Sequence, residues 1–253
     1  MLMHQTLSKG WSHARSRLLL DLFVRPRGRL VEGLTLLRYA KTGPSGLASR
    51  LGSTYAGLAE PSAAYHVLDT TLIPAIVRVR ASRKGLFAGQ ATFGRSASKT
   101  EWVYGFKVAL VVDPAGVITT FGLAPAASDE RPIADALIAS DRHDGYLADK
   151  GFTGVEWERR WLEEYGSLVA ATPKDDSRRA WSKADRRWAS GKRQVIEGVI
   201  YQLKDFFGLE SHRAKTLGGL LARLAAKVAA YTCAQRINEC LGRPKRQLAD
   251  LLL

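Results

Sequence analysis

The stretch from Ser190 to Phe207 constrains the fold most, because its apolar residues recur with the period of an α-helix. At about 100° per residue, these residues share one arc of the helix surface that is about 140° wide. They are Val195, Ile196, Val199, Ile200, Leu203, Phe206 and Phe207. The pattern therefore predicts an amphipathic helix that packs this face inward.

A narrow polar stripe runs beside that apolar face. With Arg193 as the origin, Lys204 lies at about 20° and Glu197 at about 40° around the helix axis. The simple interpretation is a surface helix with an Arg193–Glu197 ion pair, although arginine before glutamate is the weaker order. Lys204 lies about 10 Å along the axis from Glu197, beyond direct pairing. This row of cation, anion and cation also suits a site for metal and phosphate, which needs further carboxylates.

Two aspartates elsewhere in the chain follow short apolar runs. The run from Tyr65 to Thr71 predicts a β-strand with Asp69 at its end, and 145–148 predicts another that Asp149 follows. In α/β sheets, ligands bind at strand ends, so both aspartates are candidates for a site. The order Thr153-Gly154-Val155-Glu156 predicts a capping box that starts the next helix.

The other elements follow from apolar periodicity and from turn residues. Strands are expected at 102–112, 117–123 and 168–171, with a hairpin turn at 113–116. Helices are expected at 12–23, 30–39, 129–138 and 217–231, with another beginning near 46. Residues 172–192 are expected to be a polar, basic connection, and 242–246 a frayed basic tail.

The charge of the chain narrows its class of partner. Its 253 residues carry a formal net charge of +14 with a pI near 10.0, which favours a polyanion such as nucleic acid. Residues 1–60 hold nine basic residues and three acidic ones, and two short predicted helices joined by a Gly-containing turn are one arrangement of a helix-turn-helix reader. A basic arm that contacts phosphates without reading bases is the alternative.

A second basic segment, residues 78–107, is interleaved with aromatic residues. This combination suits a surface that binds the phosphate backbone and stacks on bases, although a solvated loop explains any single residue equally well. Neither this segment nor any other contains an apolar run of the ~20 residues that a membrane helix needs. We therefore expect no membrane contact.

The chain thus offers three acidic residues, Asp69, Asp149 and Glu197, on three predicted elements of a basic protein. Mg²⁺ prefers carboxylate and water oxygens. Two such ions, roughly 3.5–4 Å apart, can activate an attacking oxygen and stabilise a leaving oxygen at a phosphodiester. Three carboxylates from three elements could hold such a pair.

The motifs around these acids resemble those of DDE-type insertion-sequence transposases. The segment from Asp149 to Phe152 matches the D-x-G-[YF] motif of that family. Arg193, Glu197 and Lys204 match its R-x3-E-x6-K motif with both spacings intact. The resemblance covers roughly residues 65–231, and Ser190 stands where the family has a tyrosine.

The resemblance implies a fold and a set of roles. The fold is α/β, with a ribonuclease H-like mixed sheet flanked by helices, a short mostly helical N-terminal region and a C-terminal helix. The expected domains are a basic region at 1–60 with truncated DNA-binding helices, a catalytic domain at 61–210, and a packed helix with a basic tail at 211–253. The implied metal-binding triad is Asp69, Asp149 and Glu197. The residues expected to contact DNA are Arg193, Lys204, Lys107 and Lys192.

The implied activity is Mg²⁺-dependent cleavage of DNA at the ends of an insertion sequence, followed by strand transfer to target DNA. Two Mg²⁺ ions are expected, and Mn²⁺ can substitute. The implied partners are double-stranded terminal inverted repeats and target DNA, bound by a homodimer in a synaptic complex, in the cytoplasm on a bacterial nucleoid. Two alternatives stay open: a truncated or silent remnant that binds DNA without cutting, and a ribonuclease H-like nuclease of another role.

Overall fold

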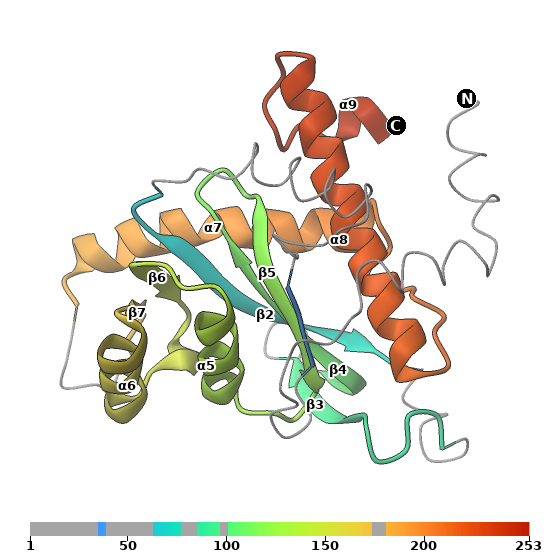
Figure 1. The fold of residues 1–253 in the computed structure, drawn as a ribbon, viewed down its shortest axis with the longest axis horizontal. Coiled ribbons are helices and arrows are strands. Elements are labelled where there is room, and N and C mark those ends of the chain that lie inside the picture. The colour runs from blue at the N-terminus through green and yellow to red at the C-terminus, as the bar shows by residue number, and fades with distance from the viewer. Residues whose placement is uncertain (1–34, 39–62, 77–84, 97–100, 174–180, 253) are drawn as a thin grey trace, which may run out of the picture.

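A computed structural model describes residues 35–38, 63–76, 85–96, 101–173 and 181–252 (Figure 1). The strands are β1 (Thr35–Arg38), β2 (His66–Pro74), β3 (Thr92–Ser96), β4 (Glu101–Val112), β5 (Ile118–Pro125), β6 (Gly145–Ala148) and β7 (Leu168–Ala171). The helices are α5 (Glu130–Ser140), the 3₁₀ turn η1 (Lys150–Phe152), α6 (Val155–Tyr165), α7 (Lys183–Asp205), α8 (Leu217–Cys240) and α9 (Ala249–Leu252). None of these helices is both long and apolar enough to span a membrane.

The strands form one mixed sheet in the order β1-β5-β4-β2-β6-β7, with β3 paired to β4. The pairs β1–β5, β5–β4, β3–β4 and β4–β2 are antiparallel, whereas β2–β6 and β6–β7 are parallel. A mixed sheet flanked by helices confirms the ribonuclease H-like fold that the resemblance implied.

Side-chain alternation along β4 assigns the two faces of the sheet. Val108, Leu110 and Val112 are buried in a cluster with residues of α7 and α8. Ala109 and Val111 are buried in a second cluster with residues of α5 and α6. Since neighbouring residues of a strand point to opposite faces, β4 supplies both halves of the core. Figure 1 shows α7 running across one face of the sheet, with α5 and α6 on the other.

The amphipathic helix expected at 190–207 is α7, but it begins earlier, at Lys183. Ser182 caps it by accepting a hydrogen bond from the backbone N–H of Asp185 at 3.1 Å. The connection expected at 172–192 is therefore helical in its last ten residues. The first two turns of α7 bury only Ala189, so the sequence there has no apolar periodicity that could predict a helix.

The segment after α8 is held by hydrogen bonds although most of its residues are exposed, so the expectation of a frayed tail at 242–246 was wrong. The side-chain amide of Gln202 in α7 donates a hydrogen bond to the carbonyl of Arg246 at 2.7 Å. Leu248 is completely buried in the same cluster as α7. One buried leucine and a few backbone contacts are enough to order a segment that composition alone suggests is solvated.

Two further local predictions differ from the structure. The predicted helix 30–39 contains strand β1, because Thr35–Arg38 pairs with the edge of β5. A short apolar run of this kind fits helix or strand, and the available partner decides.

The capping box predicted at Thr153 does not form. Gly154 is the N-cap residue of α6, and its N–H donates a hydrogen bond to Glu158 Oε1 at 3.1 Å. The helices predicted at 12–23 and near 46 lie outside the described residues.

The inward face of α7 makes a prediction about stability. Leu203 is 0% exposed, so Leu203→Ala should lower the free energy of unfolding by about 2–5 kcal/mol through lost burial and a residual cavity. Tyr201 on the same helix is 63% exposed, and Tyr201→Ala should change it by less than about 0.5 kcal/mol. Urea unfolding measures both, and equal effects would contradict the assigned packing.

Candidate active site

An open cavity of about 1200 Å³ lies between α7, the middle of β2, the end of β6 and the β3–β4 pair. Asp69, Asp149 and Glu197, the three predicted acids, all line it. Of the residues expected to contact DNA, Arg193, Lys107 and Lys204 also line it. Lys192 is exposed on α7 but does not line the cavity.

Asp69 lies in the middle of β2 rather than at its end, which corrects the sequence interpretation. The strand continues to Pro74, because β4 pairs with it along that length. The parallel pairing with β6, however, ends at Leu68 and Ala148. Asp69 and Asp149 are the next residues of the two strands, so they leave the parallel pair together. The relevant strand end is therefore that of β6.

The guanidinium of Arg193 bridges these two aspartates. Its Nη2 lies 3.2 Å from Asp69 Oδ2, and its Nη1 lies 3.1 Å from Asp149 Oδ1. Asp69 reaches α7 because Val67, two residues earlier in β2, belongs to the face that α7 covers. The simple interpretation of an Arg193–Glu197 pair within the helix was wrong, since Arg193 pairs across to the sheet.

Burial sets the electrostatics of Asp69. Only 18% of its side chain is exposed, and this burial raises its pKa from 3.8 to about 6. Arg193 and a 2.7 Å hydrogen bond from the backbone N–H of Thr70 oppose the rise, while Asp149 and Glu130 add to it. One guanidinium therefore does not fully compensate the charge gathered here, and additional positive charge would stabilise the ionised form.

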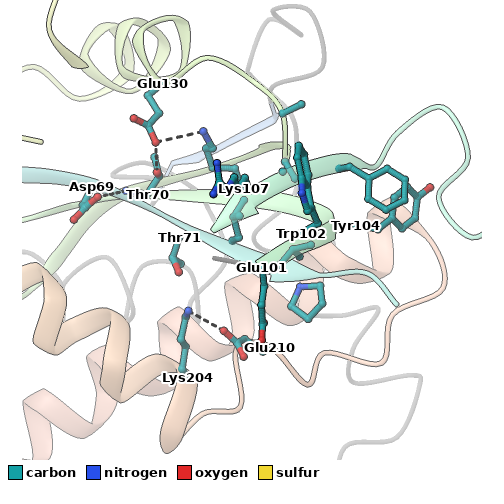
Figure 2. A pocket seen from close by; sticks show the side chains of 18 of the residues that line it. Asp69, Thr70, Thr71, Glu101, Trp102, Tyr104, Lys107, Glu130, Lys204 and Glu210 are labelled. Atoms are coloured by element: carbon teal, nitrogen blue, oxygen red, sulfur yellow. Dashed lines mark hydrogen bonds and ion pairs between the residues drawn. The ribbon is translucent and has the colours of Figure 1, made fainter. Parts of the chain in front are cut away.

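Glu197 and Lys204 extend the site along α7. Glu197 is exposed, one helical turn beyond Arg193, and faces the same cavity. Lys204 forms an ion pair with Glu210, in the segment after α7, at 2.7 Å between Nζ and Oε1 (Figure 2). The ammonium expected to contact DNA is therefore at the cavity, with an acidic partner that a phosphate could displace.

Glu130 is a further acid at the cavity, next to Asp69 in space, and it was missing from the sequence prediction. It is the first residue of α5, where an acidic residue is common because it favours the helix dipole, so nothing in the sequence distinguished it. Its Oε1 accepts a hydrogen bond from Thr70 Oγ1 at 2.8 Å and lies 3.3 Å from Lys107 Nζ. Figure 2 shows these three side chains together beside Asp69.

The β3–β4 pair forms an aromatic wall at the cavity. Phe93 lies opposite Tyr104, and Arg95 lies opposite Trp102, so all four residues share one face of the pair. Phe93 is 45% exposed and Trp102 is 49% exposed, although both line the cavity. The wall belongs to the basic and aromatic segment 78–107, whose role as a surface for phosphates and bases stays a prediction.

The donor chemistry of the site suits a hard divalent cation, since carboxylate oxygens dominate it. Within the described parts of the chain, however, no three His, Cys, Asp or Glu side chains are close enough together to hold a metal ion. Asp69 and Asp149 instead share the guanidinium of Arg193, whose single positive charge compensates the two carboxylates only in part. The fit to a metal thus depends on Arg193 giving up this position.

The fold and the cavity define a ribonuclease H-like protein with acidic residues gathered where β2 and β6 separate. The model of the transposase DDE domain family matches residues 61–217, well over half of the chain, and the chain belongs to that family. This confirms the resemblance drawn from the motifs. No curated protein matches the chain significantly. Membership makes the chain a transposase in the general sense, a class that acts on DNA and generally depends on divalent metal.

The raised pKa of Asp69 predicts a pH dependence of stability in metal-free protein. Below pH 3.8 the carboxyl is protonated in both states, and its contribution is fully present. As the pH rises from 3.8, the unfolded state loses its proton first, while the folded state keeps its proton up to about pH 6. The contribution of this carboxyl to the free energy of unfolding is lost over that window. The free energy of unfolding of the wild type, relative to Asp69→Asn, should fall over that window and then stay constant.

Urea unfolding in EDTA, at a series of pH values, measures that difference. Because Arg193 lowers the pKa of Asp69, Arg193→Gln should move the upper end of the window to higher pH. Wild-type and Asp69→Asn curves that stay parallel between pH 4 and 7 would contradict the assigned burial.

Proposed function

We propose that the protein is a metal-dependent DNA transposase that cleaves phosphodiester bonds at the ends of an insertion sequence and joins the freed 3′-hydroxyl to target DNA. The observation that carries the proposal is that Asp69, Asp149 and Glu197 all line one cavity, in a chain of the transposase DDE domain family. These acids come from β2, the end of β6 and α7, far apart in sequence.

In this proposal, Asp69, Asp149 and Glu197 hold two Mg²⁺ ions, for which Mn²⁺ can substitute. When bound, the metal supplies positive charge that activates the attacking oxygen and stabilises the leaving oxygen. The support is the donor set together with the raised pKa of Asp69, because further positive charge would stabilise the ionised form of that carboxyl. Arg193 would then leave the aspartates and bind the scissile phosphate.

The remaining cations would bind the DNA backbone around that phosphate. Lys107 and Lys204 line the cavity, and each has an acidic partner, Glu130 and Glu210 respectively. Lys192 is exposed next to Arg193 and would contact a phosphate outside the cavity. Phe93 and Trp102 would stack on bases of the same strand.

The substrates in the proposal are double-stranded terminal inverted repeats and target DNA, held by a homodimer in a synaptic complex on a bacterial nucleoid. The net charge of +14 supports a nucleic-acid partner. Terminal repeats and dimers are expected from the family rather than from any residue of this chain. Sedimentation with and without end DNA tests the dimer.

A transposase remnant that binds DNA without cutting is the second candidate. The bridging of Asp69 and Asp149 by Arg193 favours it, because the two aspartates already have a cation. The substitution of the family tyrosine by Ser190 favours it as well. The two candidates differ in one observable, strand cleavage in the presence of metal.

The triad predicts a shared loss of activity. Asp69→Asn, Asp149→Asn and Glu197→Gln should each reduce nicking of supercoiled DNA carrying the element ends, with Mg²⁺, by at least about 100-fold. Each removes one metal-binding carboxylate, so DNA affinity should change little. Glu156→Gln removes an exposed acid of α6 that does not line the cavity, and it should nick at the wild-type rate.

If the wild-type protein binds the element ends but never nicks them, it is a remnant that binds DNA without cutting it. Nicking that survives all three triad substitutions would instead place the chemistry elsewhere. Transfer of a labelled 3′ end into a plasmid separates the transposase from a nuclease of another role.

The aromatic wall predicts a contribution to DNA binding. Trp102→Ala should weaken the binding of end DNA by about 1–3 kcal/mol, as expected for the loss of one stacked base. Trp188, which is 54% exposed on α7 and does not line the cavity, provides the matched control. Fluorescence anisotropy at fixed salt measures both, and equal effects of the two substitutions would argue against stacking at the wall.

A further inference from the structure

The carboxylate of Glu130 lies between three segments next to the paired aspartates: β2 at Thr70, β4 at Lys107 and the turn at Gly151. Its Oε1 accepts hydrogen bonds from Thr70 Oγ1 at 2.8 Å and from Lys107 Nζ at 3.3 Å. Lys107 Nζ also donates to the carbonyl of Ser128 at 2.9 Å, so the ammonium is held between two acceptors. Thr70 directly follows Asp69, and the contact therefore reaches the first aspartate through one peptide unit.

The other oxygen of Glu130 lies against the turn that follows the second aspartate. A Cβ atom added to Gly151 would lie only 1.7 Å from Glu130 Oε2, so this carboxylate occupies the space where a side chain would stand. Gly151 lies two residues after Asp149, in the turn η1. The glycine in the Asp149–Phe152 motif thus has a physical reason in this chain: it admits the carboxylate of Glu130.

We propose that Glu130 is a positioning residue, which sets the separation of Asp69 and Asp149 and holds Lys107 at the cavity. This inference rests on the proposed function, because it assigns the purpose of that spacing to binding of the metal. Glu130 joins the sheet position after Asp69 to the turn after Asp149, and its charge stabilises the ammonium of Lys107.

The geometry separates this role from that of a metal ligand. Asp69 points to the face of β2 that Arg193 of α7 covers, whereas Thr70, the next residue, points to the α5 face and meets Glu130. Oε1 of Glu130 is already engaged by Thr70 and Lys107, and Oε2 packs beside Gly151, away from the face of β2 that carries Asp69. Glu130 thus acts through the residues that it contacts.

Three substitutions isolate the contact. Glu130→Ala removes the carboxylate, whereas Glu130→Gln keeps an oxygen acceptor for Thr70 and loses the charge that holds Lys107. Gly151→Ala introduces the colliding Cβ, and the atom that it meets is the end of a flexible side chain that can rotate away. Gly151→Ala should therefore displace Glu130 and leave the protein folded.

The test is a double-mutant cycle read by the Mn²⁺ concentration that gives half of the maximal rise in Tm. Glu130→Ala and Gly151→Ala should each raise that concentration about tenfold, as substitution of a residue behind a metal ligand typically does. The combined variant should differ from either single variant by less than about twofold, since both remove the same contact. Glu130→Gln should fall between the wild type and Glu130→Ala.

Several outcomes would overturn the inference. If the fold increases in the Mn²⁺ midpoint of the two single variants multiply in the combined variant, Gly151 does not act through Glu130. A lower metal-free Tm with an unchanged Mn²⁺ midpoint means a merely structural role. A loss in Glu130→Gln as deep as in Asp69→Asn means that Glu130 is a ligand. Glu156→Gln, the exposed control on α6, should leave the midpoint unchanged.

The same preparations distinguish failure of this inference from failure of the proposed function. A wild type whose Tm rises with Mn²⁺ but which never nicks DNA refutes the transposase activity and leaves the cycle for Glu130 readable. If the wild type nicks DNA but the increases in the Mn²⁺ midpoint multiply in the combined variant, only the role of Glu130 is refuted. No response of the wild type to Mn²⁺ overturns both.

Discussion

The arrangement of the site depends on the burial of one carboxyl, that of Asp69, beside a second one, Asp149. Burial and like charge both disfavour ionisation, and the pKa of Asp69 rises to about 6 even with the guanidinium of Arg193 in contact. The structure therefore has a position at the end of β6 where positive charge is needed. In the protein alone a helix supplies that charge through Arg193, and a divalent cation at this position would supply more of it.

Helix α7 belongs both to the core of the protein and to the candidate site. Its inward face, including Ile196, Val199 and Leu203, belongs to the largest part of the core, packed against β4 and α8. Its neighbouring stripe carries Arg193 and Glu197 into the cavity. Because the two faces belong to one rigid element, core packing determines how far these charged groups lie from the sheet.

Much of the fold could be predicted from sequence, since strands β4, β5, β6 and β7 and helices α5, α7 and α8 have clear periodicity or turn residues at their ends. The failures were local. Strand β1 depended on an available sheet edge, and the start of α7 lacked apolar residues. Glu130 could not be found as a site residue, because its partners Thr70, Lys107 and Gly151 are 21 to 60 residues away.

The sequence by itself determined the residue types of the site: three acids, the Arg193-x3-Glu197-x6-Lys204 spacing on a single helix face, and a basic chain around them. Such spacings are local, and the helix period converts them directly into geometry. Only the tertiary structure decided that Arg193 pairs with Asp69 and Asp149 rather than with Glu197. Strand register and the packing of α7 on the sheet set those distances, and both arise from contacts between segments far apart in the chain.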